Sequence, residues 1–173
     1  DMVIDNSQNL VFDSSLNVYN APISIQINPG FSVTSLTNQI FYIGYDFNDH
    51  PIVLDSFVNN TTITGGYYPF NIGEGAVVRS IINHGEMFAD QNISASSPFI
   101  NNQGGIINEL FNDGSIHSFG IEAIRNDDGS RIDKLINLGT IKDDDTYIGI
   151  ANYGTITQLD NLQGGNALLV ISG

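Results

Sequence analysis

Hydrophobic and polar positions along this chain recur with a fixed period. From about residue 100 onward, short apolar segments alternate with turns rich in Asn, Asp and Gly, and the arrangement returns every 25 residues. Two sets of glycines mark this period: Gly104, Gly129 and Gly154, and Gly114, Gly139 and Gly164. A constant period of this size indicates stacked supersecondary units, each of which covers the apolar face of its neighbour.

The repeating unit predicts an all-β fold. It is too short and too rich in turn residues for a helical pair, but it fits one coil of a parallel β-solenoid, or β-helix, with three short strands joined by tight turns. We expect the glycines to adopt left-handed conformations at the corners of each coil. We also expect buried asparagines to form side-chain ladders between coils.

Superposing successive units assigns residues to columns. The predicted polar columns contain Asn83, Asn112 and Asn137, and Asn102, Asp127 and Asn152. The predicted apolar columns contain Met87, Ile116 and Ile141, and Ile81, Leu110 and Leu135. Each column is expected to follow the solenoid axis, with like residues in contact.

Regularity differs between the two parts of the chain. Residues 71–173 carry the regular repeat, whereas residues 1–70 are interpreted as irregular coils or a cap of the same solenoid. Alternating apolar residues in 16–19, 23–27 and 40–43 predict strands there. A single continuous domain is favoured, and the alternative is a separate small β-sandwich up to about residue 70.

Both ends of the chain contain apolar strands. Solenoid ends expose unpaired backbone groups and apolar core, which favours pairing with another strand. We therefore predict end-to-end contacts between copies of the chain. The residues assigned to these contacts are Met2, Ile4, Leu168, Leu169, Val170 and Ile171.

Charge narrows the range of partners. The chain has a formal net charge of −14, and its five basic residues all lie between positions 79 and 142. Such an acidic surface repels phosphate backbones and anionic lipid headgroups, so we expect no nucleic-acid partner. No apolar run is long enough to span a bilayer, so no membrane insertion is expected.

The repeat motif resembles those of bacterial surface β-helices. Ile136-Asn-Leu-Gly139-Thr-Ile141 and Ala151-Asn-Tyr-Gly154-Thr-Ile156 are similar to repeats of autotransporter passenger domains and filamentous-haemagglutinin-like adhesins. The resemblance implies an extracellular or bacterial cell-surface location and a part in adhesion, autoaggregation or fibre building. We expect a structural or adhesive protein rather than an enzyme, with the subunit of a self-assembling extracellular filament as one form of that role. The alternatives are a polysaccharide-active β-helix enzyme and a phage or virus fibre part that binds a host glycan.

Two acidic clusters are candidate sites. Asp143, Asp144 and Asp145 follow a predicted strand, and Asp127 and Asp128 lie near a corner of the same coil. Clustered carboxylates bind Ca²⁺ or work as acid/base pairs, but they are more often solvated turns, and that last interpretation is favoured. We expect no cofactor, with calcium as the alternative.

Tyrosines form the remaining candidate site. Tyr42 and Tyr45 lie among Asp and Asn residues, and Tyr67 and Tyr68 are adjacent in the chain. Aromatic rings beside carboxylates and amides suit glycan or protein contacts, but capping of the core by these rings is the competing interpretation. The histidines have no partner at metal-ligand spacing, so surface positions are expected for them.

Overall fold

The structure is a computed structural model that describes residues 2–4, 10–12, 16–18, 23–30, 32–35, 39–45, 49–93, 96–145, 148–162, 166–167 and 169–171. Every regular element within these residues is a β-strand, and none is a helix. It follows that the described residues include no helix able to cross a membrane.

The strands form three parallel sheets with seven strands in each. Sheet A contains β1 (Met2–Ile4), β4 (Ile23–Ile27), β7 (Val53–Asn59), β10 (Val77–Asn83), β13 (Ile106–Asn112), β16 (Arg131–Asn137) and β19 (Thr155–Asn161). Sheet B contains β2 (Leu10–Phe12), β5 (Ser32–Ser35), β8 (Thr62–Gly65), β11 (Glu86–Ala89), β14 (Ser115–Ser118), β17 (Thr140–Asp143) and β20 (Asn166–Ala167). Sheet C contains β3 (Leu16–Val18), β6 (Phe41–Ile43), β9 (Phe70–Ile72), β12 (Ile100–Asn102), β15 (Ile124–Asn126), β18 (Ile150–Asn152) and β21 (Leu169–Ile171).

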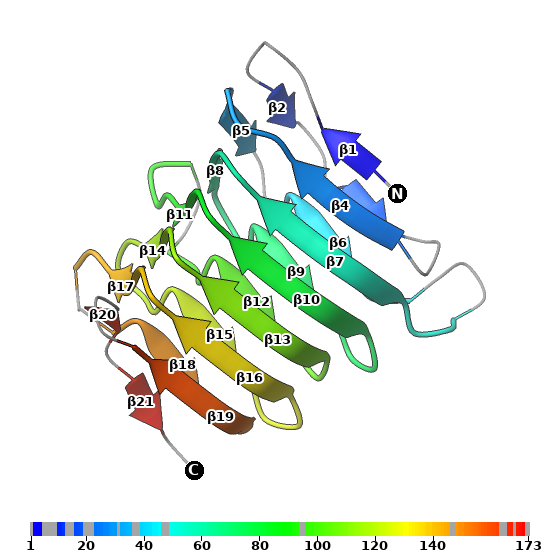
Figure 1. The fold of residues 1–173 in the computed structure, drawn as a ribbon, viewed down its shortest axis with the longest axis vertical. Helices are drawn as coiled ribbons and strands as arrows, with labels where there is room; N and C mark the ends of the chain where they lie inside the picture. The colour runs from blue at the N-terminus through cyan, green and yellow to red at the C-terminus, as the bar shows by residue number, and fades with distance from the viewer. Residues whose placement is uncertain are drawn as a thin grey trace.

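The chain visits the sheets in the fixed order A, B, C, so each circuit forms one coil (Figure 1). Each strand pairs in parallel with its counterpart in the neighbouring coil. The predicted parallel β-solenoid is therefore confirmed. Strands from the first 70 residues lie in the same three sheets as those of the regular repeats.

Apolar columns fill the interior between the sheets. In sheet B, Ile63, Met87, Ile116 and Ile141 are in register and have no exposed surface. The column of Ile81, Leu110 and Leu135 in sheet A is also fully buried, and Phe57 extends it by one coil. These columns agree with the sequence-based prediction. Each side chain is removed from water by its own equivalents above and below.

Larger side chains fill the core near the less regular coils. Phe41, Phe57 and Phe70 come from three different strands and meet edge to face or tilted, with ring centroids 4.8–5.8 Å apart. All three are fully buried. This aromatic cluster shows that the core is continuous from coil two into coil three.

Strict alternation is interrupted at one place in the sheet A strands. In β13, Ile107, Leu110 and Asn112 are buried, whereas Asn108 and Glu109 are consecutive residues that both remain partly exposed. The same spacing occurs in β7, β10 and β16. Because of this shift, an asparagine at the end of each strand faces inward.

Glycines at the corner between sheets A and B are required by close backbone contact. A Cβ atom added to Gly114 would lie 2.0 Å from the carbonyl oxygen of Gly85, and one added to Gly139 would lie 2.0 Å from that of Gly114. The left-handed conformation predicted for them is wrong, because positive φ occurs instead at Gly104 (+89°) and Gly129 (+76°). Glycine is therefore required within one repeat for two different reasons, close backbone contact at one corner and positive φ at another. Gly164 lies outside the described residues.

The predicted column of Asn102, Asp127 and Asn152 is confirmed for the two asparagines and is wrong for Asp127. Asn102 pairs with Asn126, which in turn pairs with Asn152, so the steps are 24 and 26 residues rather than 25 and 25. Gly154 faces the carbonyl oxygens of Ser130 and Asp127 instead of lying in line with Gly129. Corners of different length offset one another, so the overall 25-residue period of the sequence does not reveal this shift.

The C-terminal segment does not form one strand as expected. Asn166–Ala167 pairs with β17 in sheet B, and Leu169–Ile171 pairs with β18 in sheet C. Met2–Ile4 does form a strand, in which Met2 and Ile4 pair with Ile25 and Ile27. Leu168 lies outside the described residues.

The two kinds of glycine give a stability prediction. Gly114→Ala places a methyl group against a backbone oxygen that cannot move away, and it should lower the free energy of unfolding by about 3 kcal/mol or more. Gly129→Asn meets no atom within 4 Å and needs only a left-handed asparagine, so it should cost about 1 kcal/mol or less. Urea denaturation monitored by circular dichroism measures both. Equal losses of unfolding free energy in the two variants would contradict the assignment of different constraints to Gly114 and Gly129.

Candidate functional site

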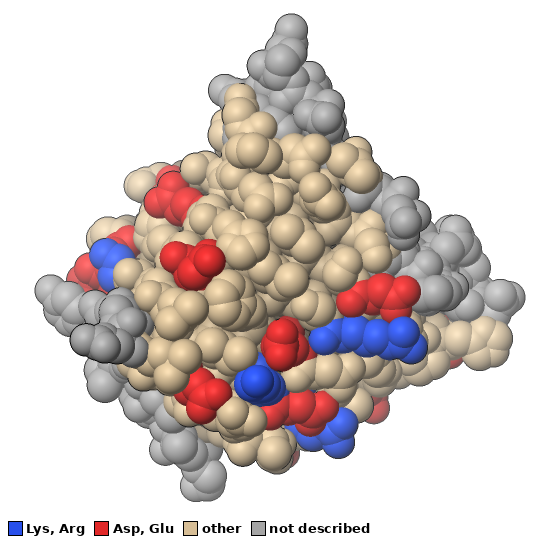
Figure 2. Space-filling view, in the orientation of Figure 1, with Lys and Arg blue, Asp and Glu red and all other residues tan. Residues whose placement is uncertain are grey.

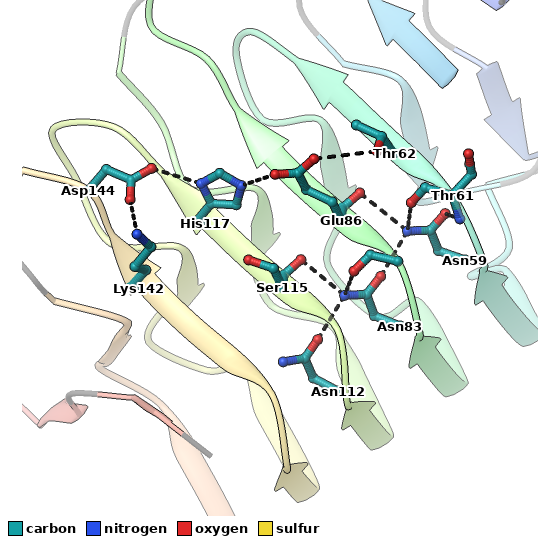
Figure 3. Close-up of polar contacts among 11 residues, drawn as sticks. Asn59, Thr61, Thr62, Asn83, Glu86, Asn112, Ser115, His117, Lys142 and Asp144 are labelled. Carbon is teal, nitrogen blue, oxygen red and sulfur yellow. Dashed lines mark hydrogen bonds and ion pairs between the residues drawn. The ribbon is translucent and has the colours of Figure 1, made fainter. Parts of the chain in front are cut away.

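A ladder of asparagines follows the corner between sheets A and B (Figure 3). The amide nitrogen of each asparagine donates to the side-chain oxygen of the next over 2.7–2.8 Å. The ladder joins five coils through Asn59, Asn83, Asn112, Asn137 and Asn161. It includes the predicted column and extends it by one residue at each end.

The ladder also satisfies backbone groups. Asn83 Nδ2 donates to the carbonyl oxygens of Gly85 and Ser115, and Asn112 Nδ2 donates to that of Thr140. An amide carries both donors and an acceptor, so identical asparagines can bond to one another without repulsion. Asn59, Asn83, Asn112 and Asn137 are fully buried, and Asn161 at the end of the ladder is exposed. The buried amides are uncharged and hydrogen-bonded along the ladder, which assigns them a structural role.

A second polar row crosses the outer face of sheet B. His117 Nδ1 lies 2.8 Å from an oxygen of Asp144, and His117 Nε2 lies 2.9 Å from an oxygen of Glu86. Lys142 Nζ is 2.5 Å from the other oxygen of Asp144. Figure 3 shows Asp144, His117 and Glu86 in a line over three successive coils, with Lys142 beside Asp144, and we call these four side chains the charged row.

Packing fixes the centre of the charged row. The His117 ring stacks on Phe88 of the preceding coil, with centroids 4.4 Å apart and planes 12° apart. Only 13% of the His117 side chain is exposed, so the expected surface position is wrong for this histidine. Both ring nitrogens face carboxylate oxygens, and only an imidazolium can donate to both.

The environment of Asp144 in the charged row displaces the pKa of its carboxyl. Partial burial would raise the pKa of its carboxyl, but hydrogen bonds from Lys142 and His117 outweigh burial and lower it. Asp144 therefore stays ionised and links its two neighbours. The charged row thus joins three successive coils through side-chain ion pairs.

The three aspartates of the 143–145 run have three different environments. Asp143 is fully buried and accepts hydrogen bonds from the backbone N–H groups of Gly120 and Asp145. Asp144 belongs to the charged row, and Asp145 is exposed. Asp143 ends β17 and points inward, whereas Asp144 and Asp145 belong to the turn that follows, so carboxylates that are adjacent in sequence are separated in space.

The other acidic pair lies at a different corner. Asp127 and Asp128 belong to the turn between β15 and β16, whereas Asp143 ends β17 in sheet B. Burial raises the pKa of Asp127, an effect that nearby Arg125 reduces and Glu122 reinforces. Among the described residues no three Asp, Glu or His side chains are grouped so that they could hold a metal ion.

The predicted tyrosines lie in separate places. The Tyr42 hydroxyl covers Gly44 and Gly73, and Tyr45 is 37% exposed. Tyr67 and Tyr68 pack together with centroids 4.0 Å apart. A side-chain hydrogen bond with Tyr67, together with burial, raises the pKa of Tyr68 to about 12.

The corner between sheets C and A varies in length from coil to coil. Four residues separate β9 from β10, three separate β12 from β13, four separate β15 from β16, and two separate β18 from β19. These loops lie side by side along one edge of the solenoid (Figure 1). The longer turn 127–130 therefore projects between two shorter corners and leaves a notch on each side.

Each notch is a small open cavity. The first encloses about 410 Å³ beside Tyr153 and Arg131, and the second about 350 Å³ beside Glu74 and Gln103. Both share Asp128 and Gly129 as a common wall. The sequence analysis did not select Tyr153, because it is isolated from the aromatic clusters. The sequence feature that could have identified Tyr153 is an aromatic residue at the variable position of the Asn-x-Gly-Thr-Ile motif.

Comparisons of the chain with protein-family models, with curated proteins and with solved structures found no match.

The charged row gives a prediction about pH. Because the pKa of folded Asp144 is lowered below 3.8, its ionisation stabilises the fold above that pH, and this stabilisation is lost as the pH falls through the folded pKa. Asp144→Asn should cost roughly 1 kcal/mol at neutral pH and little in acid. Thermal melts over a pH series measure the difference.

Asp145→Asn is the matched control, since it changes an exposed carboxylate in the same turn. It should leave the melting temperature at neutral pH almost unchanged. A loss in Asp144→Asn that persists undiminished at low pH would show that the ionised carboxylate is not responsible.

Proposed function

We propose that this protein is a structural and adhesive β-solenoid of a bacterial cell surface or its surroundings, which extends by stacking end to end. The observation that supports this proposal is the incomplete burial of the apolar side chains of β19. In β16 the side chains of Ile132 and Leu135 have no exposed surface, whereas their partners in β19, Ile156 and Leu159, are only partly buried.

The surface beyond β19 has the chemistry of a coil interface. Its edge presents backbone hydrogen-bonding groups, two partly exposed apolar side chains and one carboxylate, Asp160. Such an edge pairs readily with another parallel strand, because pairing satisfies the backbone and buries the apolar residues. The occupant that we assign to it is a second copy of this chain.

A suitable partner surface exists at the opposite end of sheet A. Strand β1 pairs with β4, and in the strand order it has no neighbour on its other side among the described strands. Its residues Met2–Ile4 are uncharged. Contact between β19 of one copy and β1 of another is heterologous, and repeating it produces an open fibre.

Charge favours assembly along the axis rather than side by side. Ion pairs such as Arg79–Asp55 and Arg131–Asp133 neutralise parts of the lateral face, and Figure 2 shows each basic side chain of the viewed face next to acidic ones. The net charge of −14 nevertheless leaves copies of the chain repelling one another. End docking adds apolar burial and strand pairing to offset that repulsion.

The resemblance of the repeat motif supports the cellular context. Of the two Asn-x-Gly-Thr-Ile units similar to those of autotransporter passengers and filamentous-haemagglutinin-like adhesins, the one that begins at Asn137 forms a corner of the ladder, and the other begins at Asn152, the last residue of a strand of sheet C. Rigid rods of this kind hold adhesive surfaces away from a cell. This support concerns the type of repeat and adds to the argument from β19.

The proposal predicts concentration-dependent association. Analytical ultracentrifugation of the intact chain should show dimers and longer species as the concentration rises. Ile156→Asp combined with Leu159→Asp should abolish them, since a charge at either position cannot be buried in a dry interface. Circular dichroism checks that the variant remains folded.

Thr157→Asp is the matched control, because Thr157 is exposed on the same strand. It should associate nearly as well as the original chain. A monomer at the highest soluble concentration, or equal loss of association in the Thr157 variant, would contradict the assignment of this edge.

A further inference from the structure

The notch beside Tyr153 combines an exposed ring with fixed polar groups. Tyr153 is 45% exposed, in contrast to the buried aromatic side chains of the core. Asp128 and Arg131 line the same cavity, and both are exposed. Its volume of about 410 Å³ lies within the range of small-molecule sites, roughly 300–1,000 Å³.

The depth of the notch comes from the two-residue corner at Tyr153 and Gly154. A Cβ atom on Gly154 would lie 2.4 Å from the carbonyl oxygen of Ser130 and 2.5 Å from that of Asp127. Glycine therefore lets this corner pack tightly under the turn 127–130. The turn 127–130 projects beyond this corner, so Tyr153 lines the notch beside the turn.

Neighbouring residues hold the Tyr153 ring in place. The Arg125 guanidinium lies over the ring, 6.0 Å from its centroid. Arg125 is itself paired with Glu122, whose side chain is only 7% exposed. Burial would lower the pKa of Arg125, but the hydrogen bond and charge of Glu122 raise it above its usual value. A permanently charged, anchored guanidinium thus positions the aromatic surface.

Arg131 is oriented in a similar way. Its Nε lies 2.7 Å from Asp133 Oδ1, and its Nη2 donates to Asp133 Oδ2 over 3.4 Å. A guanidinium has five N–H donors, so this pairing leaves donors for a ligand. Asp128 offers carboxylate oxygens from the opposite wall, and Thr155 adds a hydroxyl.

We propose that the Tyr153 notch binds a neutral pyranose unit of a glycan. The C–H face of a pyranose packs on an aromatic ring, and its hydroxyls accept hydrogen bonds from a guanidinium and donate them to a carboxylate. Anionic sugars are disfavoured, because acidic groups outnumber basic ones around the notch: Glu122, Asp127, Asp128 and Asp133 against Arg125 and Arg131.

This inference rests on the adhesive part of the proposed function and supplies its ligand class. It does not depend on end-to-end stacking. A single shallow cavity gives weak affinity, and a fibre with one notch in each copy would strengthen attachment to a repeating glycan through multivalency.

The test uses the intact chain and defined trisaccharides. Maltotriose, cellotriose, mannotriose, chitotriose and, as the anionic probe, trigalacturonate are titrated up to about 10 mM and followed by saturation-transfer NMR and calorimetry. At least one neutral trisaccharide should bind saturably. Tyr153→Ala should weaken that binding by about tenfold or more, whereas Tyr153→Phe, which keeps the ring, should stay within about threefold.

Two further variants separate the possible failures. Tyr45→Ala removes an exposed tyrosine elsewhere and should leave binding unchanged. The Ile156→Asp/Leu159→Asp variant should bind the sugar as a monomer, so failure of assembly is distinguished from failure of sugar binding. No binding of any neutral trisaccharide, undiminished binding to Tyr153→Ala, or a preference for trigalacturonate would overturn the proposal.

Discussion

Parallel stacking of equivalent coils places each residue over its counterpart in the next coil, at the spacing of paired strands, about 4.8 Å. Only side chains that tolerate their own copy at that distance can repeat along the axis. Apolar side chains do so, and so do asparagines, whose amides donate to one neighbour and accept from the other. The interior columns of this protein consist mainly of these two kinds.

The same constraint explains how the glycines are distributed. At the corner between sheets A and B, successive backbones approach so closely that no Cβ fits at Gly114 or Gly139. This contact keeps the A-to-B corner the same length in the regular coils. The corner between sheets C and A is not held to one length, and from β9 onward it changes between two and four residues. Irregular surface features, including both notches, therefore collect along that edge.

Much of the fold could be predicted from the sequence because columns repeat residue types. The repeat predicts one column of Asn83, Asn112 and Asn137, and their hydrogen bonds confirm it. The same period predicts the wrong place for Asp127, since a 24-residue step followed by a 26-residue step looks like two steps of 25. Spacing reports the length of a whole coil but does not show how that length is divided among three corners.

The candidate sites were harder to predict for a related reason. Asp143, Asp144 and Asp145 form a cluster in sequence, but β17 ends at Asp143 with its side chain buried, and the turn that follows carries Asp144 to the charged row and leaves Asp145 exposed. Tyr153 gave little signal because its importance comes from the short corner that it occupies and from Arg125 in the preceding coil. Such sites depend on contacts between coils, which the order of residues within one coil does not specify.

Stacking restricts charged residues most strongly, because a charge that is repeated in register repels its equivalent in the next coil. On sheet A, Glu109 lies in register with Lys134, so opposite charges meet. On sheet B the column runs from Phe88 through His117 to Lys142. His117 lies between two carboxylates, Glu86 from the preceding coil and Asp144 from the following one, and Asp144 also pairs with Lys142. His117 therefore enters the stack together with partners from the coils on either side, which makes the charged row a property of three coils rather than of one repeat.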